Sequence, residues 1–157
     1  MVIFQPYRYL TKRAIKENID PIYTALALFW KAESNYRLGL FRNALQDFKS
    51  FERNPQAQKT NEFQFVNYHI GYTHFKLKDY EPAANEFQKY INKKPKDNNK
   101  LNDTYLRLGD SYFAASNYWK AMDGYNKAID LNGIEVDYAL YQKAISYGFV
   151  NRNADKI

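Results

Sequence analysis

Apolar residues recur at helical spacing through most of the chain, and short polar stretches interrupt them. The first such stretch, residues 7–19, predicts a helix with one apolar stripe and otherwise basic faces. Asp20 and Pro21 predict the start of the next helix. An Asp side chain accepts a hydrogen bond from an unpaired N–H of the first turn, and Pro has no N–H that would need a partner there. We expect this helix to continue through Leu38 and to end at Gly39 in a left-handed cap.

A second helix is expected through Ala44 to about Arg53, and the pattern of this helix pair then returns twice more. Four columns of small and aromatic residues carry the repeat: Ala32, Gly71, Gly109 and Ala144; Phe41, Tyr80 and Tyr118; Ala44, Ala83 and Ala121; Phe48, Phe87 and Tyr125. The first small residue precedes the second by twelve positions in every repeat, so the pair has a constant length. The extra residues fall in the polar connections 55–61 and 93–102, where insertions add little loop-closure entropy.

These columns have a direct physical meaning. A residue without bulk on each helix lets two backbones approach closely where they cross. Large aromatic side chains on either side fill the remaining volume and reach into the next pair. The columns therefore predict antiparallel helix pairs, each of which packs on its neighbours.

The third copy, Tyr105 to Tyr112 followed by Tyr118, Ala121, Tyr125 and Ala128, resembles the tetratricopeptide repeat, a helix–turn–helix unit. The resemblance covers residues 22–150 and implies an all-α fold, a right-handed α-solenoid of antiparallel helix pairs. It divides a single domain, residues 1–157, into three full repeats and a half repeat at each end: 5–19, 22–55, 61–95, 101–132 and 135–150. The chain departs from the family pattern at Asn35, where Tyr is preferred, and at Phe51 and Tyr90, where Ala is preferred.

The two half repeats suggest a segment of a longer, bacterial-type array. Residues 5–19 resemble a second helix without its first, and residues 137–150 resemble a first helix without its second. Solenoid arrays normally finish with a polar capping helix, which neither end provides. We therefore expect the terminal helices to be uncapped and able to support self-association.

Composition places the chain among soluble globular proteins, with 45% hydrophobic and 25% charged residues. There is no cysteine, hence no disulfide framework or thiol chemistry. No apolar run approaches the length of a membrane span, so we expect no membrane insertion. The cellular compartment is not indicated.

No pattern typical of catalysis, cofactor binding or metal binding occurs in the sequence. His69 and His74 lie about 140° apart around a helix, so they cannot share a metal, and His74 is expected to be a packing residue. Asp79 is expected to be a helix N-cap and not a general base. There is no glycine-rich phosphate loop or nucleophile elbow. We predict a protein that is not an enzyme and has no cofactor.

The formal net charge of +6 raises the alternative of nucleic-acid binding. Basic residues cluster in two places: Arg8, Lys12, Arg13 and Lys16, and Lys89, Lys93, Lys94, Lys96 and Lys100. The second cluster falls on a second helix and the loop after it, on the outer side of a superhelix of this family. A solvated face explains it better than a nucleic-acid site.

The family resemblance implies a concave surface that is lined by the first helices and holds peptides or protein segments. By alignment, the residues facing it are Phe29, Glu33, Tyr36, Phe65, Tyr68, Tyr72, Phe75, Asp103, Leu106, Arg107, Asp110, Phe113, Tyr138, Tyr141 and Ile145. Some of these aromatic rings are equally explained by packing between repeats. Members that clamp a terminal carboxylate use Lys, Asn and Arg in these columns, and here only Arg107 matches, which argues against that ligand.

Three functions follow, in decreasing order of support. The first is a non-catalytic scaffold that binds a protein or peptide of unidentified sequence in the concave groove. The second is a structural segment of a long repeat array, whose aromatic surfaces serve assembly. The third is nucleic-acid binding through the basic faces.

Overall fold

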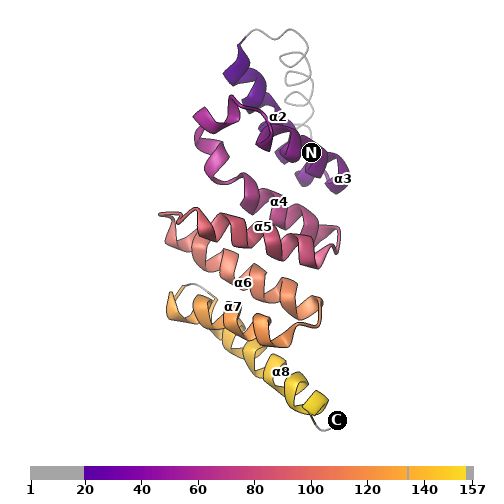
Figure 1. Ribbon diagram of the computed structural model, residues 1–157, viewed down its shortest axis with the longest axis vertical. Helices are drawn as coiled ribbons and strands as arrows, with labels where there is room; N and C mark the ends of the chain where they lie inside the picture. The colour runs from indigo at the N-terminus through magenta and orange to yellow at the C-terminus, as the bar shows by residue number, and fades with distance from the viewer. Residues whose placement is uncertain (1–19, 134, 155–157) are drawn as a thin grey trace. The chain divides into compact units, whose positions relative to one another are not determined.

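The computed structural model of the protein describes residues 20–133 and 135–154, and all regular secondary structure in these ranges is helical (Figure 1). The helices are α2 (Pro21–Arg37), α3 (Phe41–Glu52), α4 (Val66–Lys76), α5 (Tyr80–Asn92), α6 (Asn98–Ala114), α7 (Tyr118–Asp130) and α8 (Val136–Ala154). Two 3₁₀ turns, η1 (Ala57–Lys59) and η2 (Asn61–Gln64), lie between α3 and α4. The predicted all-α fold class is confirmed. The helix predicted over residues 7–19 and the half repeat 5–19 lie outside the described residues.

The chain divides into two compact units, residues 1–78 and 79–157, and the division falls in the turn between α4 and α5. The described helices of the first unit are α2 to α4, and those of the second are α5 to α8. The division into a single domain of five repeat segments remains a prediction. We refer below to α2, α4, α6 and α8 as first helices and to α3, α5 and α7 as second helices.

Side-chain caps mark the starts of α2, α6 and α7. The Asp20 carboxylate accepts a hydrogen bond from the Ile22 N–H at 2.8 Å, as its position before Pro21 predicts. Asp97 accepts from the Lys100 N–H at 3.0 Å and so starts α6. The expectation for Asp79 was wrong in part, because it occupies the N-cap position of α5 but its side chain makes no capping hydrogen bond.

The turn inside each helix pair contains a residue in the left-handed region. Gly39 has φ +75°, as predicted, and Lys78 and Ser116 take the same conformation at 64° and 60°. The two later copies therefore close the same turn with side chains for which this conformation is less favourable. Only the first copy carries the glycine that signals this turn in the sequence.

The connections between repeats differ from the sequence prediction. Residues 57–64, expected to be a polar loop followed by the start of a helix, form η1 and η2, and α4 begins only at Val66. The Ala57 side chain is fully buried in the core of the first unit, which explains why this segment folds back onto α3. The second connection is shorter than predicted, since α6 begins at Asn98.

Small and aromatic columns form the core of the first unit. Ala32 and Ala44 are fully buried, and Phe29, Phe48 and Phe51 surround them. The Phe29 ring meets those of Phe48 and Phe51 edge to face, with centroids 5.5 and 5.2 Å apart. This packing fixes α2 and α3 as a pair.

The core of the second unit depends on the close approach of α6 and α7, which run side by side in Figure 1. A Cβ placed on Gly109 would lie 2.6 Å from the Tyr125 ring. A Cβ on Gly124 would lie 2.9 Å from the Gly109 backbone nitrogen and 3.2 Å from the Tyr105 carbonyl oxygen. The two backbones are therefore in contact at Gly109, which lies in a predicted column of small residues, and at Gly124, which lies in none.

The close approach yields a stability prediction with a matched control. Gly124→Ala should destabilise the protein by about 1–3 kcal/mol, because the added methyl group meets backbone that must move. Gly148→Ala, on α8, should instead stabilise it by roughly 0.5–1 kcal/mol, since nothing lies within 4 Å of the new Cβ and Ala favours a helix. Urea denaturation of the two variants measures both effects. Equal shifts of the midpoint in the same direction would contradict the close approach.

Candidate functional site

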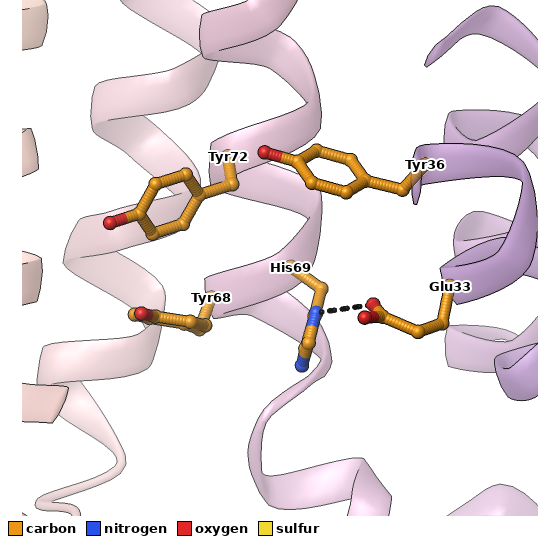
Figure 2. A pocket seen from close by; sticks show the side chains of 5 residues that line it. All are labelled: Glu33, Tyr36, Tyr68, His69 and Tyr72. Carbon is orange, nitrogen blue, oxygen red and sulfur yellow. Dashed lines mark ion pairs between the residues drawn. The ribbon is translucent and has the colours of Figure 1, made fainter. Parts of the chain in front are cut away.

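In the first unit, five residues line a pocket of about 200 Å³ between two first helices. Glu33 and Tyr36 come from α2, and Tyr68, His69 and Tyr72 come from α4 (Figure 2). We call this the tyrosine pocket. Four of its five residues are ones that the sequence alignment placed on the concave face.

Glu33 provides the charge of the tyrosine pocket. Its carboxylate accepts a hydrogen bond from Arg37 Nε at 2.8 Å and lies 3.3 Å from His69 Nδ1, the contact drawn in Figure 2. The interaction with His69, followed by that with Arg37, lowers the pKa of Glu33 although burial opposes this. Burial, with the charge of Glu33 adding to it, raises the pKa of Tyr36. At neutral pH the pocket thus holds the Glu33 carboxylate beside the neutral hydroxyl of Tyr36.

The hydrophobic core positions the imidazole of His69. Its ring stacks on Phe48 with centroids 5.4 Å apart and an interplanar angle of 30°. It also meets Phe29 edge to face at 5.2 Å and Tyr68 at 5.6 Å. The position of His69, and through it that of the Glu33 carboxylate, follows from the packing of α2, α3 and α4.

The second unit has a pocket of about 160 Å³, lined by Asn99, Asn102, Asp103 and Leu106 of α6 and by Glu135. Glu135 immediately precedes α8, so this pocket lies between the N-terminal part of α6 and the start of α8. We call it the acid–amide pocket. The Asn102 side chain is fixed because its Nδ2 donates to the Ala128 carbonyl at 2.7 Å.

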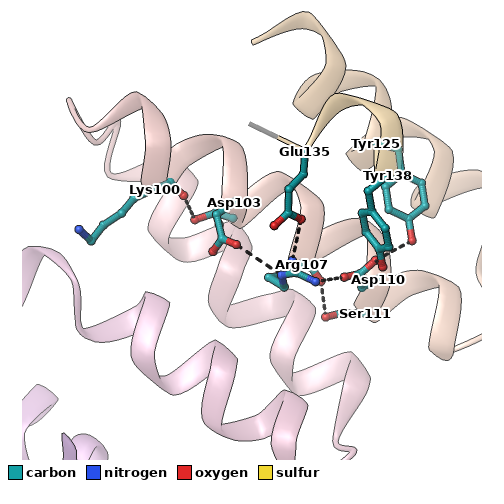
Figure 3. Close-up of polar contacts among 9 residues, drawn as sticks. Lys100, Asp103, Arg107, Asp110, Ser111, Tyr125, Glu135 and Tyr138 are labelled. Carbon is teal, nitrogen blue, oxygen red and sulfur yellow. Dashed lines mark hydrogen bonds and ion pairs between the residues drawn. The ribbon is translucent and has the colours of Figure 1, made fainter. Parts of the chain in front are cut away.

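Arg107 connects the acid–amide pocket to a network of carboxylates (Figure 3). Its guanidinium donates to Asp103 Oδ1 at 3.4 Å, to Glu135 Oε2 at 3.2 Å and to Asp110 Oδ2 at 2.5 Å. One cation thus serves three carboxylates. The carboxylates of the network outnumber the cation, so this part of the unit is acidic although the whole chain is basic.

Asp110 is the buried member of this network. Its Oδ1 accepts hydrogen bonds from the hydroxyls of Tyr125 at 3.0 Å and Tyr138 at 2.8 Å. Burial raises the pKa of Asp110, although Arg107 and the two hydroxyls favour the ionised form. Burial also raises the pKa of Tyr138 to about 12 and that of Tyr125 above its ordinary range. These contacts join α6, α7 and α8.

The structure brings some of the predicted concave-face residues together and leaves others apart. Phe29 and Leu106 are only 3% and 2% exposed, so their side chains belong to the two cores. Phe113 packs against Tyr118 and Phe149, with centroids 5.5 and 5.8 Å away. The remaining predicted residues outside the pockets and the network are Phe65 and Phe75, half-buried on either end of α4, and Ile145, half-buried, and Tyr141, exposed, on α8.

Four residues that line the pockets were missed by the sequence reasoning: His69, Asn99, Asn102 and Glu135. A signal existed for His69, which lies two positions before Gly71 as Arg107 lies before Gly109. The aligned helix columns do not include Glu135, because it lies in the loop before α8. It lines the pocket from that loop.

The described residues hold no group of three or more His, Asp or Glu side chains able to bind a metal ion. None of the helices in this part of the chain is long and apolar enough to span a bilayer. Within the second basic cluster, Lys89 pairs with Glu86 at 2.7 Å and Lys100 with Asp97 at 3.2 Å. The first basic cluster, at Arg8 to Lys16, lies outside the described residues.

One segment of the chain matches a known family of repeats. Residues 66–97 match the profile of the tetratricopeptide repeat. This segment comprises α4, α5 and the loop after them. No curated protein has a sequence that matches this chain.

Solved structures give the fold. BtubC (BKLC) from P. vanneervenii is 13% identical with a TM-score of 0.73, and the match covers 92% of this chain and 64% of that one. This chain thus spans less than two thirds of the length of BtubC. MamA from Desulfovibrio magneticus RS-1, residues 41 to the end, is 15% identical with a TM-score of 0.60, and the match covers 97% and 93%. The MamA RS-1 ArsTM double mutant is also 15% identical, with a TM-score of 0.59. These neighbours are helical solenoids of the tetratricopeptide type, so the predicted fold class is confirmed.

The electrostatics of Glu33 yield a pH prediction. Because its pKa is lower in the folded than in the unfolded protein, its stabilising contribution is present above about pH 4.5 and is lost as the pH falls through the folded pKa. Glu33→Gln should therefore lower the free energy of unfolding by about 1 kcal/mol at pH 7. The difference from wild type should shrink toward pH 3.

Thermal unfolding from pH 3 to pH 7 measures this dependence. Glu62→Gln, which replaces a half-buried glutamate of the same unit outside the pocket, is the control for the loss of a carboxylate elsewhere. A Glu33→Gln effect that is constant with pH would contradict the role of its charge.

Proposed function

We propose that this chain, which has a fold of the tetratricopeptide type and matches the profile of that repeat over residues 66–97, is a non-catalytic protein-interaction scaffold. The proposed ligand is a peptide or protein segment that lies against first helices. Its candidate binding sites are the tyrosine pocket of the first unit and the acid–amide pocket of the second, each considered by itself. The bound segment is a partner chain of unidentified sequence.

The observation that carries this proposal is that each unit has a pocket against a first helix. The tyrosine pocket lies between α2 and α4, and the acid–amide pocket lies between α6 and the residue that precedes α8. A hollow of this kind suits a peptide that places a side chain in it.

The chemistry of the two linings supports a peptide ligand. Tyrosine offers a rigid apolar face and a polar hydroxyl at little conformational cost, and tyrosine is enriched where proteins bind peptides. The carboxylates of Asp103 and Glu135 and the amide of Asn99 can accept or donate hydrogen bonds to a peptide backbone. Volumes of about 200 and 160 Å³ fit single side chains better than a whole metabolite.

A catalytic reading of the tyrosine pocket has less support. Glu33 and His69 form an acid–imidazole pair, which can orient a general base. The five lining residues, however, include no Ser, Thr, Cys or Lys that such a base would activate. Binding without chemistry therefore accounts better for this set of side chains.

Two adjacent tyrosines provide the test. Tyr68→Ala/Tyr72→Ala should weaken binding of a partner at least tenfold, because loss of aromatic anchors at a binding pocket costs about 1–2 kcal/mol each. Tyr23→Ala, which removes a tyrosine 68% exposed on α2 outside the pocket, should leave binding unchanged. Partners are recovered from lysate with each immobilised variant, and affinity for a recovered partner is then measured by fluorescence anisotropy.

Circular dichroism of the variants verifies that each one is folded. If the folded double variant and wild type bind the same partner with equal affinity, the first-helix pockets are not the binding surface. The scaffold proposal in this form would then be abandoned.

A further inference from the structure

One face of α8 is exposed along its length. Leu140, Tyr141, Ala144, Tyr147 and Gly148 follow one another at spacings of three and four residues, which places them on one side of the helix. Leu140, Tyr141 and Tyr147 are 48%, 63% and 57% exposed, and Ala144 and Gly148 are also exposed. We call these five residues the α8 stripe.

The equivalent face of α6 is covered by a helix. Aligned through the column of Gly109 and Ala144, the α8 stripe corresponds to Tyr105, Leu106, Gly109, Tyr112 and Phe113. Leu106 is 2% exposed and packs in one cluster with Ala121 and Tyr125 of α7. In α6 this face therefore packs against another helix, α7, and the contact consists of small and aromatic side chains.

We infer that the α8 stripe binds the α8 stripe of a second copy of this chain, with the two helices antiparallel and a two-fold axis at Ala144. This inference concerns α8 and goes beyond the proposed binding of a partner in the two pockets. It assigns Tyr141, which the alignment placed on the concave face, to contact between copies.

The sequence of the stripe is complementary to itself in this orientation. With the axis at Ala144, Leu140 lies opposite Gly148 of the second copy, so a large side chain meets an open position. Tyr141 lies opposite Tyr147 of the second copy. The crossing of α6 and α7 uses the same combination, in which the Tyr125 ring lies against Gly109. A closed dimer follows, since each copy contributes the same surface.

The polar residues at the two ends of the stripe favour the antiparallel orientation. Asp137 and Asn151 are exposed and continue the stripe by one turn at either end. In the antiparallel pair each Asp137 lies opposite Asn151 of the second copy, whose amide can donate to the carboxylate. In a parallel pair the two Asp137 carboxylates would face each other and repel.

The surface involved is sufficient for a weak dimer. If a fully covered tyrosine buries about 250 Å² at most, the exposed parts of the stripe on two copies amount to roughly 1,000 Å². This is the lower limit for a specific interface, so we expect the association to be weak. The dimer should therefore depend on concentration.

Sedimentation velocity of the chain from about 1 to 500 µM tests this inference directly. Wild type should change from monomer to dimer over this range, and Tyr147→Glu should remain monomeric. Trp119→Glu is the matched control, because it removes a tryptophan 68% exposed on α7 outside the stripe and should dimerise as wild type does.

Gly148→Leu separates close helix packing from nonspecific hydrophobic association. Nothing lies within 4 Å of a Cβ at this position, so the monomer should fold, whereas the new side chain collides with Leu140 of the second copy. Dimerisation should weaken at least tenfold, but nonspecific association would strengthen with the added leucine. A wild-type chain that stays monomeric throughout, or a Gly148→Leu variant that dimerises as well as wild type, overturns the inference. Neither result bears on the binding of a partner in the two pockets.

Discussion

The contact between the α6 and α7 backbones at Gly109 and Gly124 is the constraint on which the second unit depends. Neither position has room for a methyl group, because the Tyr125 ring fills the space beside Gly109 and the Gly109 backbone fills the space beside Gly124. The approach lets Tyr125 reach Asp110, and Asp110 in turn holds Tyr138 of α8. A local steric condition thus fixes three successive helices and the network around Arg107.

The first unit meets the same geometric requirement with different chemistry. The position of Gly124 in its repeat is occupied by Asp47, which is 7% exposed. Its carboxylate accepts hydrogen bonds from Asn35 Nδ2 at 2.8 Å and from Lys31 Nζ at 2.5 Å. A buried polar group is tolerated when its hydrogen bonds are made, and such a network favours one arrangement of the helices over others. Asn35, a departure from the family pattern, is therefore explained by its partner on α3.

Much of the fold was predictable because it depends on residues that are close in sequence or recur at fixed spacing. The twelve-residue separation of small residues identified the helix pairs, and Asp20, Pro21 and Gly39 identified the ends of α2. The path of residues 57–64 was not predictable, because it is set by burial of Ala57 against helices far from it in sequence.

The candidate site shows the same limit. The first-helix columns included Glu33, Tyr36, Tyr68 and Tyr72 among the residues expected on the concave face, and these four line one pocket. They did not reveal that His69 would be turned toward Glu33 by stacking on Phe48, or that Glu135 would reach Arg107 from outside a helix. Column alignment predicts which face a residue occupies, whereas ring packing and loop paths decide which polar groups meet.

The central claim is that a direct contact of Gly109 with the Tyr125 ring holds α6 and α7 together, and a double-mutant cycle measures it most directly. Gly109→Ala and Tyr125→Leu are made singly and together, and urea denaturation gives the free energy of unfolding of each. If the two residues are in contact, the added methyl group should destabilise the wild type but have little effect once the ring is gone, a coupling of about 1–2 kcal/mol. The hydrogen bond that Tyr125 donates to Asp110 is lost equally in both arms of the cycle and cancels. Additive effects, with no coupling, would contradict the claim.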